Sequence, residues 1–309
     1  LVPRSGLTVD YNGLPTGTLT SGREPNRGAE GLAISPDGRH AYAMLQNGTI
    51  QDGWSAAGGG TRGQYTRIVK YDIATGVAVA QYAYKLESSG QGRGISSIVT
   101  LGNDKFMVLE RNNRGVGVGA TLASPDKNVY VIDLAGATDV SGIALPATGA
   151  LPAGVVAATK GAKVIDLDAN TLAALGNRSP EKWEGLAVGP RLANGQYLVL
   201  AGTDNDYSVT QNGSNVQFDV YFKMDEADPY GKSIYCPLGQ VVDCFQTDGD
   251  VPVASLPATG YSLLPGVLHA YTANVDGYIA PVPEPATWAL MLGGLAAMGA
   301  VARRRRKAA

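Results

Sequence analysis

The stretch Glu30-Gly-Leu-Ala-Ile-Ser-Pro-Asp-Gly-Arg-His-Ala-Tyr-Ala-Met-Leu45 reads as two short apolar strands joined by a Pro-Asp-Gly turn. Proline presets the first turn position, and glycine accepts the left-handed backbone that many tight turns require. Small and branched apolar residues on both sides of the turn favour extended strands. The sequence therefore predicts a β-hairpin with a glutamate at its head.

The same pattern returns twice further along the chain. It recurs as Glu184-Gly-Leu-Ala-Val-Gly-Pro190, followed after a turn by Gln196-Tyr-Leu-Val-Leu-Ala201. A looser copy, Gly94-Ile-Ser-Ser-Ile-Val-Thr-Leu101, continues as Lys105–Arg111 and carries serine in place of the leading glutamate. Internal repeats of short strands and turns are typical of radially repeated sheets, the blades of a β-propeller.

One repeat can be followed through the four strands expected of a propeller blade, and two further blades are predicted less completely. The first blade adds Arg67–Ile73 and Val77–Tyr84 to the Glu30 hairpin; the second runs from Gly94 through Asn128–Leu134; the third begins near Lys163 or Glu184 and includes Gln217–Phe222. We therefore expect an all-β, propeller-like fold. Because the strands repeat, we assign residues 1–280 to one domain.

Composition supports short strands and excludes one class of partner. The chain has 41 glycines in 309 residues and only 17% charged residues, a glycine load that disfavours helices. Its net charge of -2 offers no basic surplus to hold a phosphate backbone. We expect no nucleic-acid partner.

The two cysteines, Cys236 and Cys244, lie on either side of a Pro-Leu-Gly sequence. At this spacing they can close a hairpin disulfide in an oxidising compartment, whereas a reducing compartment leaves two free thiols in a surface loop. Zinc is not expected, because both histidines lie far away in sequence and no Cys-x-x-Cys is present.

The C-terminal residues 281–309 form a separate tail. Val282-Pro-Glu-Pro285 precedes an uncharged run, Ala286–Ala302, and the basic cluster Arg303–Lys307. As a helix the run rises about 25 Å, near the short limit for crossing a membrane, and the arginines favour a cytoplasmic end. Two plain interpretations of this run are a permanent C-terminal membrane anchor and a helix buried in the protein.

This tail resembles the PEP-CTERM sorting signal of Gram-negative bacteria, with Val282, Pro283, Glu284 and Pro285 as the sorting motif. The resemblance implies export to the cell envelope or exterior. It also implies transient insertion of the hydrophobic helix into the inner membrane and cleavage near the motif by an exosortase-type enzyme.

The chain before this tail resembles the phytase-like proteins, a family described as having the esterase-like activity of phytase. The resemblance covers about Pro25 to Phe222 and rests on four motifs: Asn26–Gly38, Phe106–Arg111, Glu184–Pro190 and Gly202–Asp206. Family members usually carry a further β segment before the first Glu-Gly-Leu. The resemblance thus implies that the propeller is incomplete at its N-terminus.

Residues that head equivalent strands of successive blades converge at a propeller's channel. On this basis we expect Glu30, Glu110, Glu184, Asp204 and Asp206 to come together. Close carboxylates require a cation or protonation, and an oxygen-only ligand set without histidine or cysteine favours calcium over zinc. The metal ligands expected are Glu30, Glu184, Asp204 and Asp206. The competing interpretation is that each acidic residue accepts backbone hydrogen bonds or forms turns.

The function predicted is a calcium-dependent hydrolase of small ester or phosphoester substrates. Its candidate catalytic residues are Glu30, Glu110, Arg111 and Glu184, with Arg111 able to pair with a phosphate or carboxylate. The alternative is a non-catalytic propeller that acts as a binding or extracellular-matrix protein. A Ser-His-Asp hydrolase is poorly supported, because no Gly-x-Ser-x-Gly motif occurs.

Overall fold

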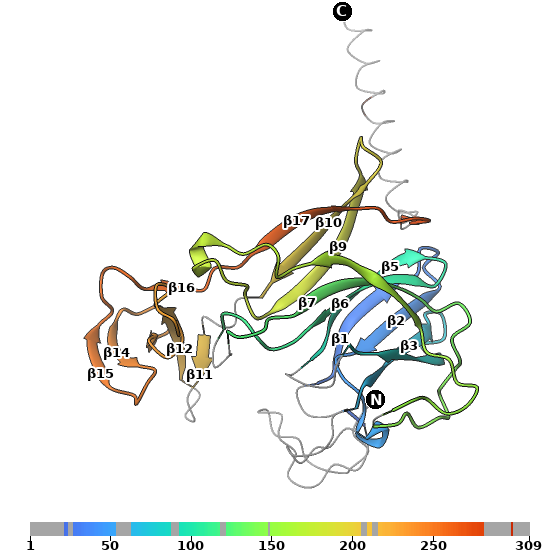
Figure 1. Ribbon diagram of the computed structural model, residues 1–309, viewed down its shortest axis with the longest axis horizontal. Coiled ribbons are helices and arrows are strands. Elements are labelled where there is room, and N and C mark those ends of the chain that lie inside the picture. The colour runs from blue at the N-terminus through green and yellow to red at the C-terminus, as the bar shows by residue number, and fades with distance from the viewer. Residues whose placement is uncertain are drawn as a thin grey trace, which may run out of the picture.

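The computed structural model describes residues 22–23, 27–53, 63–87, 93–117, 122–147, 149–204, 209–211, 216–280 and 298. In this part of the chain the elements are antiparallel β-strands and two single-turn 3-10 helices, η1 (Ile50–Asp52) and η2 (Ala173–Leu175). The all-β prediction is confirmed. The strands form several separate sheets, shown in Figure 1.

The first sheet contains the hairpin that opens the sequence repeat. Its order is β1-β2-β3-β4, and each strand pairs antiparallel with the next. At the predicted turn, Gly38 adopts a φ of 71°, and the Asp37 carboxylate accepts hydrogen bonds from Ser35 and the Arg39 backbone. The four predicted strands are confirmed; their bounds are β1 (Ala29–Ile34), β2 (His40–Leu45), β3 (Tyr65–Asp72) and β4 (Ala78–Lys85).

The second sheet repeats this arrangement with the order β5-β6-β7-β8. Its strands are β5 (Gly94–Gly102), β6 (Lys105–Arg111), β7 (Lys127–Asp133) and β8 (Thr159–Asp166). Of the two starting points predicted for the third blade, Lys163 was wrong, because it lies in β8, which pairs with β7 through Asn128 and Asp166 and completes the second sheet.

The third sheet begins with the second glutamate-led hairpin. It has the order β17-β10-β9, and its strands are β9 (Trp183–Arg191), β10 (Tyr197–Thr203) and β17 (Leu268–Ala273). The prediction that Gln217–Phe222 belongs here was wrong. The third strand comes from the end of the domain, where Ala273 pairs with Tyr197 and Leu268 with Gly202.

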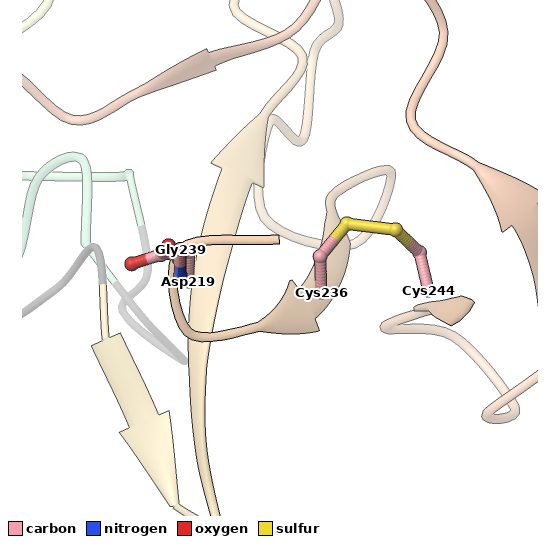
Figure 2. Close-up of a disulfide and its surroundings, with 4 residues drawn as sticks. All are labelled: Asp219, Cys236, Gly239 and Cys244. Atoms are coloured by element: carbon pink, nitrogen blue, oxygen red, sulfur yellow. Dashed lines mark hydrogen bonds between the residues drawn. A yellow bond between two sulfur atoms is a disulfide. The ribbon is translucent and has the colours of Figure 1, made fainter. Parts of the chain in front are cut away.

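The fourth sheet holds the intervening residues, including Gln217–Phe222. It runs β11-β12-β13-β14-β15, and β16 also pairs with β12. Cys236 and Cys244 form a disulfide between β13 and β14 (Figure 2). The disulfide lies in a small core with Ile234. The strands are β11 (Val209–Gln211), β12 (Gln217–Phe222), β13 (Ile234–Pro237), β14 (Val242–Gln246), β15 (Pro252–Ser255) and β16 (Ser262–Leu263).

The first three sheets stack face to face (Figure 1). Two apolar cores lie between them. Strand β6 contributes to both cores because successive side chains alternate between faces. Phe106 and Val108 lie in the core shared with the first sheet, whereas Met107 and Leu109 lie in the core shared with the third. The first strands of the sheets also adjoin, β1 against β5 and β5 against β9.

The described residues do not close these sheets into a ring, since the principal contacts between first strands stop at β1 on one side and β9 on the other. The predicted C-terminal helix and the sorting motif Val282–Pro285 lie outside the described residues, apart from Met298, which is helical. Among the residues that the structure describes, no helix has the length and apolar character needed to cross a membrane.

Candidate active site

The repeat places three equivalent positions at one end of the stacked sheets. Glu30 in β1, Ser96 in β5 and Glu184 in β9 occupy the same place in the aligned repeats, and their strands adjoin. The glycine after Glu30 permits this approach, because a Cβ at Gly31 would lie 2.7 Å from Cγ2 of Ile98 and 3.1 Å from its backbone nitrogen. We refer to this end of the sheets as the glutamate end.

Arg111, the last residue of β6, joins these positions. Its Nε donates a hydrogen bond to Ser96 Oγ at 2.7 Å, and Nη2 donates to Glu184 Oε1 at 2.6 Å. Nη1 lies 4.0 Å from a carboxylate oxygen of Glu181. The Arg111 side chain is 8% exposed, and its guanidinium hydrogen-bonds to polar partners from the second and third sheets.

Glu30 completes the group from the first sheet. The residue keeps an exposed surface, yet the protein atoms around its carboxyl raise its pKa, and the nearby charge of Glu184 raises it further. The positive charges of Arg111 and Lys182 oppose that shift. A carboxyl group with a raised pKa beside an arginine-bound carboxylate is an arrangement suited to acid–base chemistry.

Glu110 does not join this group, although it precedes Arg111 in the sequence. Its side chain leaves the opposite face of β6 and is fully buried between the first and second sheets. Tyr84 Oη and Lys160 Nζ each donate to Oε2 at 2.7 Å, and Arg93 Nη1 donates to Oε1 at 3.3 Å. The expectation that Glu110 converges with Glu184 was wrong, because adjacent residues of a strand point to opposite faces.

The predicted calcium ligands are only partly brought together. Asp204 directly follows β10, whose last residue pairs with Trp183, and therefore lies at the same end as Glu184. Asp206 lies outside the described residues. In the described part of the chain no group of three or more acidic, histidine or cysteine side chains has the arrangement of a metal site.

The chemistry of the described donors also fits calcium poorly. Glu184 already hydrogen-bonds to the guanidinium of Arg111, and Glu30 lies within the field of that same cation. Calcium needs six to eight oxygen ligands, and a guanidinium beside the carboxylates repels a second cation. The side chain that neutralises this pair of carboxylates is thus an arginine.

Two partners of the site carried no recognisable sequence signal. Glu181 faces Arg111 from the residues that precede β9, and Lys127 pairs with Arg111 across the β6–β7 ladder. The Lys127 ammonium is fully buried against Asp168, and burial lowers its pKa. The repeat alignment gave the third copy a serine in place of the leading glutamate without choosing between Ser96 and Ser97, and the structure shows that Ser96 is the one that contacts Arg111.

Comparisons with known proteins agree with the two resemblances seen in the sequence. The family profile described as Phytase-like, esterase-like activity of phytase, matches residues 3–207. The profile of the PEP-CTERM protein-sorting motif matches residues 281–307. No curated protein matches the chain. The sorting signal indicates export to the cell envelope or exterior and processing by exosortase-type machinery.

Proposed function

The chain belongs to the phytase-like family, and on that premise we propose that it hydrolyses ester or phosphoester bonds of small anionic substrates at its glutamate end. One observation carries the proposal. Arg111 donates a 2.6 Å hydrogen bond to Glu184, and the pKa of the neighbouring Glu30 carboxyl is raised by burial and by the charge of Glu184.

In the proposed reaction the two carboxyl groups have different roles. Glu184 accepts a proton from water, whose oxygen forms the new bond to phosphorus or to the acyl carbon. Glu30, in its protonated form, gives its proton to the leaving oxygen as the ester bond breaks. The positive charges of Arg111 and Lys182 attract the substrate anion. One water is consumed, and the acid and alcohol products leave. Glu184 then releases its proton to solvent and Glu30 takes one up, which restores both groups for the next turnover.

Glu110 has no part in this reaction. Its carboxylate is closed off by Tyr84, Arg93 and Lys160 and lies between two sheets. Calcium is likewise not assigned a step, because the described ligands fit it poorly. Calcium, the cofactor predicted from the sequence, remains a hypothesis, and measuring the melting temperature with and without calcium tests it.

A second function, that of a non-catalytic binding protein of the extracellular matrix, is favoured by a specific observation. Arg111 already donates to Ser96 and Glu184 and exposes only 8% of its side chain, which is the behaviour of a residue that joins sheets. Under this second function the charged group at the glutamate end stabilises the stack and contacts no substrate.

We further infer that the stacked sheets are blades of a propeller and that residues 1–280 form one domain. Two four-stranded antiparallel sheets with adjoining first strands support this arrangement. The family profile and the sorting profile cover separate parts of the chain, which supports a boundary at residue 281. We also propose that the apolar run 286–302 inserts transiently into the inner membrane before processing.

The hydrolase proposal is tested with purified chain and three anionic substrates: p-nitrophenyl phosphate, the carboxylic ester mono-p-nitrophenyl succinate, and phytate. Glu184→Gln and Glu30→Gln remove one proton acceptor and one donor while keeping the side-chain shape. We expect kcat to fall by roughly 100-fold or more in each variant, the usual effect of losing an acid–base group. Glu226→Gln, which alters an exposed ion pair with Lys223, is the control and should retain full activity.

The results separate the two functions. If the parent chain hydrolyses a substrate and both active-site variants lose that activity, the hydrolase proposal is supported. A parent chain that is folded but inactive on all three substrates, with or without added calcium, favours the binding protein. Unchanged kcat in Glu184→Gln would remove the proposed proton acceptor.

A further inference from the structure

The last described residues of the domain are docked on its surface. After β17 the chain turns through Gly277, whose φ is 73°, and Tyr278 places its ring edge against Tyr197 at a centroid distance of 5.0 Å. Ile279 then donates its backbone N–H to the carbonyl of Leu101 at 2.9 Å. We call residues 276–280 the strap.

The surface beneath the strap is shaped to receive it. Gly102 at the end of β5 has a φ of 90°, which favours glycine, and a Cβ there would lie 2.8 Å from Cβ of Ile279. Tyr278 lines a hollow with Tyr197, Val188 and Pro190 from the third sheet. The strap therefore contacts both the second and the third sheet through side chains and backbone.

The strap lies at the end of the sheets opposite the candidate active site. Leu101 and Gly102 end β5, whereas Ser96 lies near its start. Six residues of a strand separate Ser96 from Gly102, a distance of about 20 Å. We refer to the end that carries the strap, with the β5–β6 and β9–β10 turns, as the turn end. Figure 1 shows β17 running toward the β9–β10 hairpin.

The strap also limits how far the domain can lie from the apolar run. About six residues join Ala280 to Ala286, and a chain of that length spans at most about 21 Å. Pro281, Pro283 and Pro285 restrict its backbone further. The turn end must therefore stay within about 21 Å of the point where a membrane-inserted run would begin.

We propose that the turn end of the second and third sheets is the face that the unprocessed protein directs to the membrane surface, with the docked strap setting this orientation. The candidate active site then faces away from the lipid before the tail is removed. The inference rests on the membrane insertion of the tail proposed above. It does not depend on hydrolysis.

A pair of exposed alanines provides the test. Ala193 lies in the β9–β10 turn at the turn end. Ala123 precedes β7 at the glutamate end, next to Ser124, whose carbonyl accepts a hydrogen bond from Asn112. Ala193→Cys and Ala123→Cys each add one thiol for a fluorophore, because the native cysteines are joined in a disulfide.

The full-length variants are reconstituted into vesicles of phosphatidylethanolamine and phosphatidylglycerol that carry a headgroup-attached nitroxide quencher. We expect several-fold stronger quenching of the fluorophore at position 193 than at position 123. Equal quenching, or stronger quenching at position 123, would overturn the proposed orientation. Protein that fails to float with the vesicles would overturn membrane insertion and this inference together, whereas hydrolysis is assayed separately in detergent.

The strap is tested in the same vesicles. Replacing both docked side chains, by Tyr278→Ala with Ile279→Ala, should undock the strap and reduce the difference between positions 193 and 123. Asp276→Ala changes an exposed residue of the strap and should keep the full difference. A full difference in the double variant would show that the docked strap does not set the orientation.

Discussion

The two faces of β6 carry two charged clusters that differ in their access to solvent. On one face, Glu110 is fully buried and accepts hydrogen bonds from Tyr84, Lys160 and Arg93. On the other, Arg111 binds Glu184, whose side chain is 24% exposed, and lies near Glu30, which is exposed. The residues at the centre of the clusters are consecutive, yet Glu110 binds residues around the first and second sheets whereas Arg111 hydrogen-bonds to residues of the second and third.

The comparison shows how a stacked sheet separates stability from chemistry. In the Glu110 cluster the carboxylate is fully buried and every charge has a partner, and Lys160 also lies 4.1 Å from the Tyr130 ring centroid. The Arg111 cluster is sealed only toward the core. Its outer carboxyl group, Glu30, can exchange protons with solvent. We expect the first cluster to dominate the free energy of unfolding and the second to dominate activity.

The largest effect on stability is expected from Glu110→Ala. Removing this carboxylate takes an ion-pair partner from buried Arg93 and from Lys160, whose side chain is 14% exposed, and breaking a buried pair typically costs about 3–5 kcal/mol. Urea unfolding of the purified chain measures the loss. Glu226→Ala, at an exposed pair, should change the free energy of unfolding by less than about 0.5 kcal/mol. A loss below about 1 kcal/mol in Glu110→Ala would contradict the proposed division between the clusters.

Arg111→Met should have a smaller effect, about 2 kcal/mol at pH 7, the scale of hydrogen bonds to charged groups. Without the arginine, Glu30 and Glu184 repel each other as anions. Because protonation relieves this repulsion, the loss should shrink as the pH falls toward 4.5. Arg39→Met is the matched control, since Arg39 has a 79% exposed side chain and a 3.9 Å contact with Asp37. A loss independent of pH would show that the carboxylates are not coupled to Arg111.

Glu30→Gln should raise stability slightly at pH 7, by no more than about 0.5 kcal/mol because the site is exposed. The Glu30 pKa is raised above 4.5 in the folded state, so the folded protein binds the proton more tightly than the unfolded chain. The contribution of the Glu30 carboxyl to the free energy of unfolding therefore declines as the pH rises from 4.5 to the raised pKa of the folded state. The gain from Glu30→Gln should vanish below pH 4. A destabilised variant at pH 7 would show that the ionised carboxylate is favourable.

Calcium should have the smallest effect. Because Arg111 already neutralises the carboxylates at the glutamate end, we expect the same melting temperature in excess calcium and in excess chelator. A ligand that binds the folded state raises this temperature by mass action. An increase with calcium, absent with magnesium, would instead support the predicted metal site and require ligands such as Asp206 beyond the described residues.

Much of the fold could be predicted from local sequence. Turn residues such as Pro36 and Gly38, with alternating apolar residues on each side, specify the hairpins because a turn and its strands are adjacent in the chain. The repeat also identified Glu30 and Glu184 as equivalent positions, with an unspecified serine in the third copy. The tail was recognised for a similar reason, since its motif, apolar run and arginines are contiguous.

Pairings between distant segments could not be read in this way. The apolar pattern of Gln217–Phe222 suits the third sheet as well as the fourth, and only the structure shows that β17 takes the place beside β10. Strand alternation places the side chains of Glu110 and Arg111 on opposite faces of β6, but it does not tell which of the two carboxylate-bearing clusters is buried. That depends on Lys160 and Arg93, which reach Glu110 from other segments.

The sequence by itself determined the all-β class, the three repeated hairpins and the sorting tail, because each depends on interactions between near neighbours in the chain. Only the tertiary structure decided that Arg111 joins Ser96 to Glu184, that Glu110 is enclosed, and that the strap lies on Gly102. The physical reason is that burial and charge pairing depend on which surfaces meet. Sheets built from similar short strands can stack in several orders, and the apolar pattern of each strand is compatible with more than one of these orders.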